Sequence, residues 1–241
     1  MSNEFLSSKN FKSRLFTGIA LGVVVILSLI TPNAFLFRIL FFGVCAMAVL
    51  ELYMAHRNKV LFGIVVIDDR ALIVEYVFII IAVYAISTQL AVTDIWLVLV
   101  GAIASDTLAY FSGSALHGVF FKKRPFPKTS PKKSWEGIIG GTVGCIICLL
   151  GVLLIVERPL SAGSLVFIFL CPVFSIFGDY FASFCKRMLT IKDSNECIME
   201  SNLTALKFCE RFMSGHGGYL DRIDSIAMVS CLMFFIRAAK T

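Results

Sequence analysis

Charged residues are scarce in this 241-residue sequence, where Asp, Glu, Lys and Arg together make up only 16% of the chain. Soluble domains carry about 25% charged residues, so this shortage argues against a soluble globular protein. Hydrophobic residues make up 58% of the sequence, 23 of them Phe, and the mean hydropathy is +0.87. These proportions indicate a polytopic helical membrane protein.

Common soluble-enzyme signatures are also missing. The sequence contains no GxxxxGKS or GxxxxGKT loop, no GxGxxG fingerprint and no HExxH pair. Most of the eight cysteines lie in apolar runs, where Cys behaves as a small hydrophobe, so no disulfide framework is predicted. Cys145 and Cys148 have the spacing of a redox or zinc pair, but they lie in an apolar run with no second pair. We therefore predict that they pack in the core.

Long hydrophobic runs make up most of the sequence. A membrane-spanning helix needs roughly 17–25 apolar residues, and seven runs are long enough: Leu15–Thr31, Ala34–Met54, Leu72–Leu90, Ile95–Ser112, Gly137–Val156, Leu160–Cys185 and Leu220–Ile236. Val60–Ile67 is apolar but short, which fits an interfacial or re-entrant piece or part of an eighth helix. The prediction is an all-α transmembrane bundle of about seven to eight spans. We expect N-terminal helices over 1–100 and a catalytic region over 101–241, with cytoplasmic loops at 112–136 and 186–219.

Basic residues predict the orientation of this bundle. Lys and Arg gather before the first run and in every second loop, whereas the alternate loops carry only Arg158. The positive-inside rule then places the N-terminus and both long basic loops in the cytoplasm. The chain has a net charge of +6, and its basic residues cluster in these loops, which favours anionic substrates over nucleic acid. We expect a multi-pass protein of a bacterial-type cytoplasmic membrane, with its active site facing the cytoplasm.

Asp106 and Asp179 each lie inside a predicted span. Asp106 lies in the middle to late part of one span, where an ionised group needs a partner, a cavity or a metal, although an interhelical polar contact is also compatible. In another span Asp179 and Ser183 are four residues apart, on one helix face, which Lys186 continues with Arg187 beside it. This face indicates a surface for metal and phosphate. Snorkelling at a helix end explains the cations alone but leaves Asp179 unexplained.

The polar loops add further candidates. Lys132 and Lys133 lie among hydroxyls in Lys128–Gly137, which suits phosphate binding, or else a loop that only determines topology. Lys192 and Asp193 form a weaker pair, for which plain solvation is a sufficient explanation. The most informative segment is Gly215–Ser225, in which glycines surround His216.

In that segment, Gly217 and Gly218 allow the backbone to approach a bulky anion. Asp221 and Asp224 offer hard oxygen ligands about one turn apart, and Arg222 between them can grip phosphate. Because magnesium prefers oxygen, we expect His216 to contact phosphate or support the loop rather than bind metal.

These motifs resemble those of the phosphatidate cytidylyltransferase (CDP-diacylglycerol synthase) family. The family pattern S-x-x-K-R-x4-K-D, followed by P-G-H-G-G-x-x-D-R-x-D-S, is similar to Ser183–Arg187, Lys192-Asp193 and Gly215–Ser225 in order. Blocks at Asp106–Tyr110 and Ser130–Gly137 are similar as well. Two departures are a spacer of twenty-two residues between Asp193 and His216, where the family has about seven, and Ser214 in place of the family's Pro. The added segment, about 194–214, bears on the role of Asp193 and on substrate access.

The resemblance implies transfer of a cytidylyl group from CTP to phosphatidate at the bilayer, giving CDP-diacylglycerol and pyrophosphate for phospholipid synthesis. It implies Mg²⁺ held by Asp179, Asp221 and Asp224, with Ser183 and Lys186 in the catalytic set. The phosphate-binding residues it implies are Asp106, Lys132, Lys133, Lys186, Arg187, Lys192, His216, Gly217, Gly218 and Arg222. Whether a monovalent cation joins the magnesium, and whether the protein is a homodimer, stays open.

Two other functions compete with this interpretation. A CTP-dependent lipid kinase of the polyprenol type would use the same aspartates, but it would need an alcohol acceptor and a base to activate it. A non-enzymatic transporter could use Asp106 and Asp179 on an ion path, but it leaves the glycine-rich segment unexplained. The extended signature favours the transferase, and dependence on metal and CTP separates both enzymes from a transporter.

Overall fold

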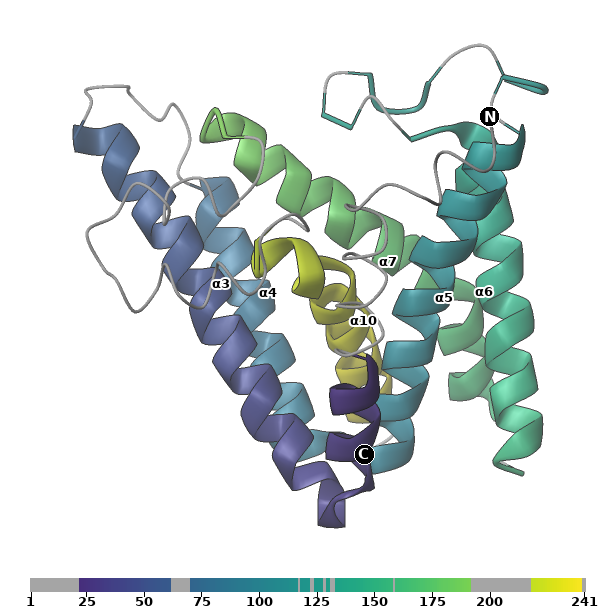
Figure 1. The fold of residues 1–241 in the computed structure, drawn as a ribbon. Coiled ribbons are helices and arrows are strands. Elements are labelled where there is room, and N and C mark those ends of the chain that lie inside the picture. Colours follow the sequence, from purple (N-terminus) through teal and green to yellow (C-terminus); the bar gives the residue numbers. More distant parts are fainter. Residues whose placement is uncertain are drawn as a thin grey trace.

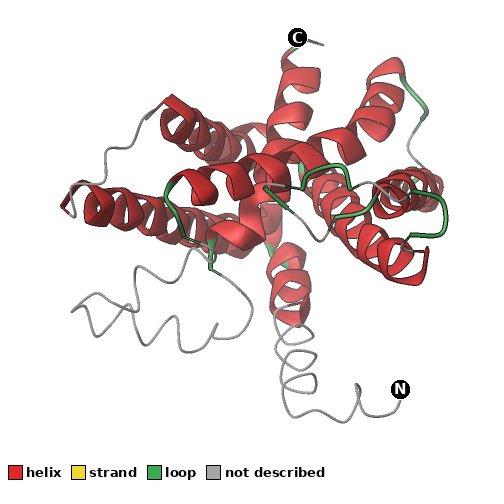
Figure 2. Cartoon of the chain, turned by 90° about the horizontal axis from the view of Figure 1, so that it is seen from above, coloured by secondary structure: helices red, strands yellow, loops and turns green. Residues whose placement is uncertain are grey.

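The computed structural model of this chain describes residues 22–61, 70–116, 118–121, 124–127, 129–130, 133–157, 159–191 and 218–239. These described residues are mostly helical and contain no β-strand, as the view from above in Figure 2 shows. The predicted all-α class is therefore confirmed. Residues 22–30 are helical, and the elements that follow are η1 (Pro32–Ala34), α3 (Phe35–Leu61), α4 (Arg70–Tyr84), the π-helical η2 (Ala85–Gln89), α5 (Val92–Leu116), α6 (Trp135–Ile155), α7 (Ala162–Met188) and α10 (Leu220–Ala238).

Within those ranges, five helical segments are long and apolar enough to cross a membrane, namely η1 with α3, α4 with η2, α5, α6 and α7. They correspond to five of the seven predicted runs. The run Leu15–Thr31 and the short Val60–Ile67 lie partly outside the described residues. The run Leu220–Ile236 forms α10, which carries four charged residues and is not among the five. The chain is thus an integral membrane protein by its helices, and the count of seven to eight spans is not confirmed.

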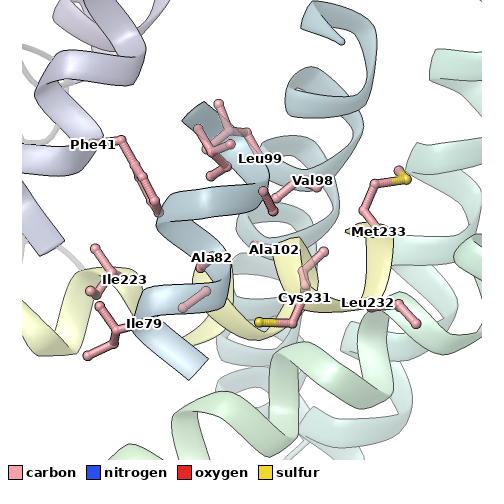
Figure 3. Close-up of a cluster of buried hydrophobic side chains, with 14 of the residues drawn as sticks. Phe41, Ile79, Ala82, Val98, Leu99, Ala102, Ile223, Cys231, Leu232 and Met233 are labelled. Carbon is pink, nitrogen blue, oxygen red and sulfur yellow. The ribbon is translucent and has the colours of Figure 1, made fainter. Parts of the chain in front are cut away.

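Helix α10 lies in the middle of the bundle. It packs against α3, α4, α5 and α7, and Figure 1 shows it between the α3–α4 pair and the α5–α6 pair. Figure 3 shows the apolar side chains that surround it, with Phe41 of α3, Ile79 of α4 and Val98 of α5 near Ile223 and Cys231 of α10. The polar helix is therefore shielded by the apolar ones.

The outer helices expose apolar side chains. Ile39 of α3, Leu154 of α6 and Phe169 of α7 are all more than half exposed. A surface covered by large apolar groups suits hydrocarbon rather than water, as helices that cross a membrane require.

Close packing joins α5 to α6. At Gly141 of α6 a Cβ atom would lie 2.7 Å from the carbonyl oxygen of Ser105 and from Cβ of Ala109, so only glycine allows this approach. Ser134 caps the start of α6 by accepting a hydrogen bond of 3.1 Å from the Gly137 N–H. Tight packing and a defined cap together fix where the basic loop before α6 enters the bundle.

A candidate active site at one end of the bundle

Three helices bring carboxylates together at one end of the bundle. Asp106 comes from the second half of α5, Asp179 from the second half of α7, and Asp224 from the second turn of α10. Their charges are close enough to interact, and Asp224 is buried with 8% of its surface exposed. Three motifs that are far apart in the sequence therefore share one site.

Two lysines pair with carboxylates in this site. The Lys133 Nζ lies 2.6 Å from Oδ2 of Asp179, which joins the basic loop to α7. The Lys186 Nζ pairs with Oδ1 of Asp221, which joins α7 to α10, and both of these side chains are largely buried. Ser183 donates a hydrogen bond of 3.4 Å to Asp179, one turn away on α7. Most of these charges are thus held by partners from other elements, as their burial requires.

The first turn of α10 adds a backbone contact and an unsatisfied donor. The Gly218 N–H donates to Oδ2 of Asp221 at 3.0 Å, so that carboxylate is held from two sides. Arg222 is half-buried and interacts with the charge of Asp221, but its Nε is buried without a hydrogen-bond partner among the described residues. A buried guanidinium donor without an acceptor suits a phosphate oxygen.

Among the described residues, one predicted phosphate ligand, Arg187, lies apart from the carboxylate pairs. Arg187 is exposed, and its guanidinium donates to the Ile191 carbonyl at 3.3 Å, at the C-terminal end of α7. Four further candidates, together with Asp193, lie outside the described residues: Lys132, Lys192, His216 and Gly217.

Several polar residues around the site were missed from the sequence. Ser175 of α7 donates to Oδ1 of Asp106 at 3.2 Å. Glu75 of α4 is buried with 4% of its surface exposed, and its charge interacts with that of Lys186. Glu136 accepts hydrogen bonds from the N–H groups of Phe120 and Phe121, at 3.2 and 3.0 Å, and so holds the loop before α6. A glutamate inside an apolar run is itself a signal of function, and this could have revealed Glu75.

The donor set suits a hard divalent cation in chemistry and charge. The described residues around the site include five carboxylates and three cations, so the set carries two excess negative charges when all are ionised. The carboxylates are Glu75, Asp106, Asp179, Asp221 and Asp224, and the cations are Lys133, Lys186 and Arg222. Carboxylate oxygens are the ligands that magnesium prefers. In the described part of the chain, no three His, Cys, Asp or Glu side chains are grouped closely enough to hold an ion as they stand. The carboxylates are thus of the chemical type that suits the metal, but two of them, Asp179 and Asp221, are paired with lysines.

Two cavities lie away from this cluster. One, of about 140 Å³, is lined by Asp94, Phe167 and Arg237, and another, of about 350 Å³, lies between α5 and α6. Asp94 begins α5 and Arg237 ends α10, so the first cavity is at the other end of the bundle. The Asp94 carboxylate pairs there with Arg237 at 2.5 Å. The chemistry-bearing residues therefore gather at the opposite end from these cavities.

Buried carboxylates with lysine partners, carried by helices long and apolar enough to cross a membrane, place this chain in the class of integral membrane proteins with a buried charged cluster. Sequence comparison assigns the chain to a family. The Cytidylyltransferase family profile matches residues 70–200, which is more than half of the chain, and the chain belongs to that family. The match includes Asp106 and Asp179 and ends before α10.

Curated relatives agree with this assignment. The chain is 36% identical over 141 residues to phosphatidate cytidylyltransferase 4, chloroplastic, of Arabidopsis thaliana, covering 58% of this chain and 31% of that protein. It is 34% identical over 157 residues to the phosphatidate cytidylyltransferase of Helicobacter pylori strain J99, and this match covers 62% of this chain and 50% of that protein. It is 33% identical over 135 residues to the phosphatidate cytidylyltransferase of Brucella abortus, and this match covers 56% of this chain and 43% of that protein. The similarity thus spans half or less of each relative's length.

Proposed function

We propose that this protein transfers the cytidylyl group of CTP to phosphatidate, releasing pyrophosphate and forming CDP-diacylglycerol for phospholipid synthesis. The observation that carries the proposal is the cluster of Asp106, Asp179, Asp221 and Asp224 with Lys133 and Lys186, in a chain of the cytidylyltransferase family. The names of the relatives supply the lipid substrate.

The reaction requires little covalent help from the protein. A phosphate oxygen of phosphatidate attacks the α-phosphorus of CTP, and the bond from that phosphorus to the oxygen bridging to the β-phosphorus breaks. Pyrophosphate leaves with the electron pair of that bond. The attacking oxygen is already anionic, so no side chain has to remove a proton, and positioning two polyanions against their repulsion is the main task.

The cations of the site perform that task. Lys133 and Lys186 exchange their carboxylate partners for phosphate oxygens when the substrates enter, and the unpaired Nε of Arg222 donates to a further phosphate oxygen. Preorganised donors of this kind stabilise charge that builds on the leaving pyrophosphate. The carboxylates released by the lysines are Asp179 and Asp221.

Magnesium held by Asp179, Asp221 and Asp224 would neutralise triphosphate charge during the transfer. The active site faces the cytoplasm, because the basic loop that supplies Lys133 is on the side favoured by the positive-inside rule. CTP then enters from water, and phosphatidate enters sideways from the inner leaflet of a cytoplasmic membrane.

The proposal is tested by incubating the purified protein in detergent–lipid micelles with CTP, phosphatidate and magnesium. CDP-lipid and pyrophosphate should form in equal amounts, and Asp221→Asn should lower the rate at least about 100-fold, because it removes a proposed magnesium ligand and the carboxylate that holds Lys186. Asp94→Asn is the matched control, since Asp94 is a buried, ion-paired aspartate at the opposite end of the bundle. Formation of CDP and a phosphorylated lipid from diacylglycerol or polyprenol, with no reaction on phosphatidate, would establish the kinase instead.

A further inference from the structure

A buried glutamate on α3 caps the N-terminal end of α10. Glu51 is fully buried, and its two carboxylate oxygens accept hydrogen bonds from the backbone N–H groups of Tyr219 and Leu220, each at 2.9 Å. The residues lie 168 and 169 positions apart in the chain. Glu51 lies outside the stretch 70–200 matched by the family profile.

This contact supplies a cap that α10 lacks. The first N–H groups of a helix have no partner within the helix, and the N-cap residue Tyr219 offers no side-chain cap. A carboxylate at this position satisfies two of those donors and interacts favourably with the positive end of the helix dipole. Because the carboxylate comes from α3, it determines where the first turn of α10 lies relative to the rest of the bundle.

That turn carries the site. Asp221 follows Leu220 directly, and its two oxygens bind the Gly218 N–H and Lys186. The N–H groups of Tyr219 and Leu220 are already occupied by Glu51, so substrate phosphates have to be bound by side chains such as Arg222 rather than by these two amides. A shift of this turn would move Asp221 and Arg222 together.

We propose that Glu51 is a positioning residue for cytidylyl transfer, acting through the first turn of α10; this rests on the function proposed above. The variants are Glu51→Ala, which removes both acceptors, and Glu51→Gln, which keeps the shape and one acceptor oxygen. Leu52→Ala is the control for lost packing on α3, because Leu52 is equally buried and points about 100° away around the helix.

The first readout is hydrogen exchange at the amides of Tyr219 and Leu220, measured by mass spectrometry on the purified protein without substrates. Exchange at these amides should accelerate in Glu51→Ala and, less strongly, in Glu51→Gln, and should stay as in the wild type in Leu52→Ala. Unchanged protection in Glu51→Ala would overturn the capping contact, whether or not the protein is a cytidylyltransferase.

The second readout is turnover per folded molecule. We expect kcat with CTP and phosphatidate to fall about ten-fold or more in Glu51→Ala and to recover in part in Glu51→Gln. It should change little in Leu52→Ala. Losses of this size are typical of residues that orient the side chains in direct contact with a ligand. Loss of folded protein at unchanged kcat, as a merely structural role predicts, contradicts the positioning role. If the wild type forms no CDP-lipid, the proposed function fails while the exchange result still decides the contact.

Discussion

At the scale of single residues, the structure separates two cations that the sequence treats alike. Lys133 and Arg187 are both predicted phosphate ligands in basic motifs. The Lys133 ammonium lies 2.6 Å from Asp179, whereas the Arg187 guanidinium binds the Ile191 carbonyl and is exposed. An exposed cation at a helix end contributes little beyond its favourable position relative to the dipole. Of these two cations, Lys133 is therefore the one placed to reach a phosphate beside the carboxylates.

This difference predicts unequal effects of substitution. Lys133→Ala should raise KM for CTP and lower kcat, together costing about ten-fold or more in kcat/KM, because it removes a phosphate donor and leaves Asp179 without its cation. Arg187→Ala should change kcat/KM less than about three-fold. Steady-state kinetics on both purified variants decides the matter, and equal losses would show that Arg187 reaches the substrate.

What the sequence could predict at this scale depends on chain distance. The motif residues of α7 and α10 were found because their spacing places them on one face or one turn. Glu51 and Ser175 were missed because their partners lie 168 and 69 positions away, and no periodicity links them. Glu75 gave a local signal, a carboxylate in an apolar run, but its partner Lys186 could be found only from the packed helices.

At the scale of elements, the hydrophobic runs predicted most helices but not their contacts. Gly178 is an example: in the sequence it only precedes Asp179. In the structure it is where α7 meets α10, since a Cβ atom there would lie 2.5 Å from the Asp224 carbonyl oxygen and 2.9 Å from Cγ of Met228. The glycine therefore permits the helix approach that brings Asp179 towards Asp224.

Gly178→Ala should separate these helices. We expect a loss of about 1–3 kcal/mol in the free energy of unfolding, from overpacking, and a marked loss of CDP-lipid formation. Gly151→Ala on α6 is the matched control, because nothing lies within 4 Å of a Cβ there and alanine favours a helix by about 1 kcal/mol. Thermal unfolding in detergent and the activity assay test both variants, and an equally stable, active Gly178→Ala protein would contradict this contact.

At the scale of the whole molecule, the site and the basic loop share one end of the bundle. Ser130 precedes α6 and Leu160 follows it, so the two residues lie on opposite sides of a spanning helix. Loop charge predicts which side of the membrane this end faces, because it depends on composition alone, and that orientation stays a prediction. The relative positions of the helices come from packing.

Orientation is tested with single cysteines at these two positions, in a protein whose eight cysteines are replaced and whose activity is retained. Ser130→Cys should react with a membrane-impermeant maleimide only when the cytoplasmic face is accessible, as in inside-out vesicles. Leu160→Cys should react only from the opposite face in intact cells. The reverse pattern would place the site outside the cell.

The central position of α10 has a consequence for biogenesis. Its four charged residues make release into lipid costly for this helix alone, since a charged residue costs about 2.5–3.5 kcal/mol near the middle of an inserting helix and less near its ends. The helices that surround it, α3, α4, α5 and α7, all precede it in the chain. They can therefore insert first, so that Asp221 and Asp224 of α10 enter the membrane only when Lys186 and the other buried polar groups of the earlier helices are already there.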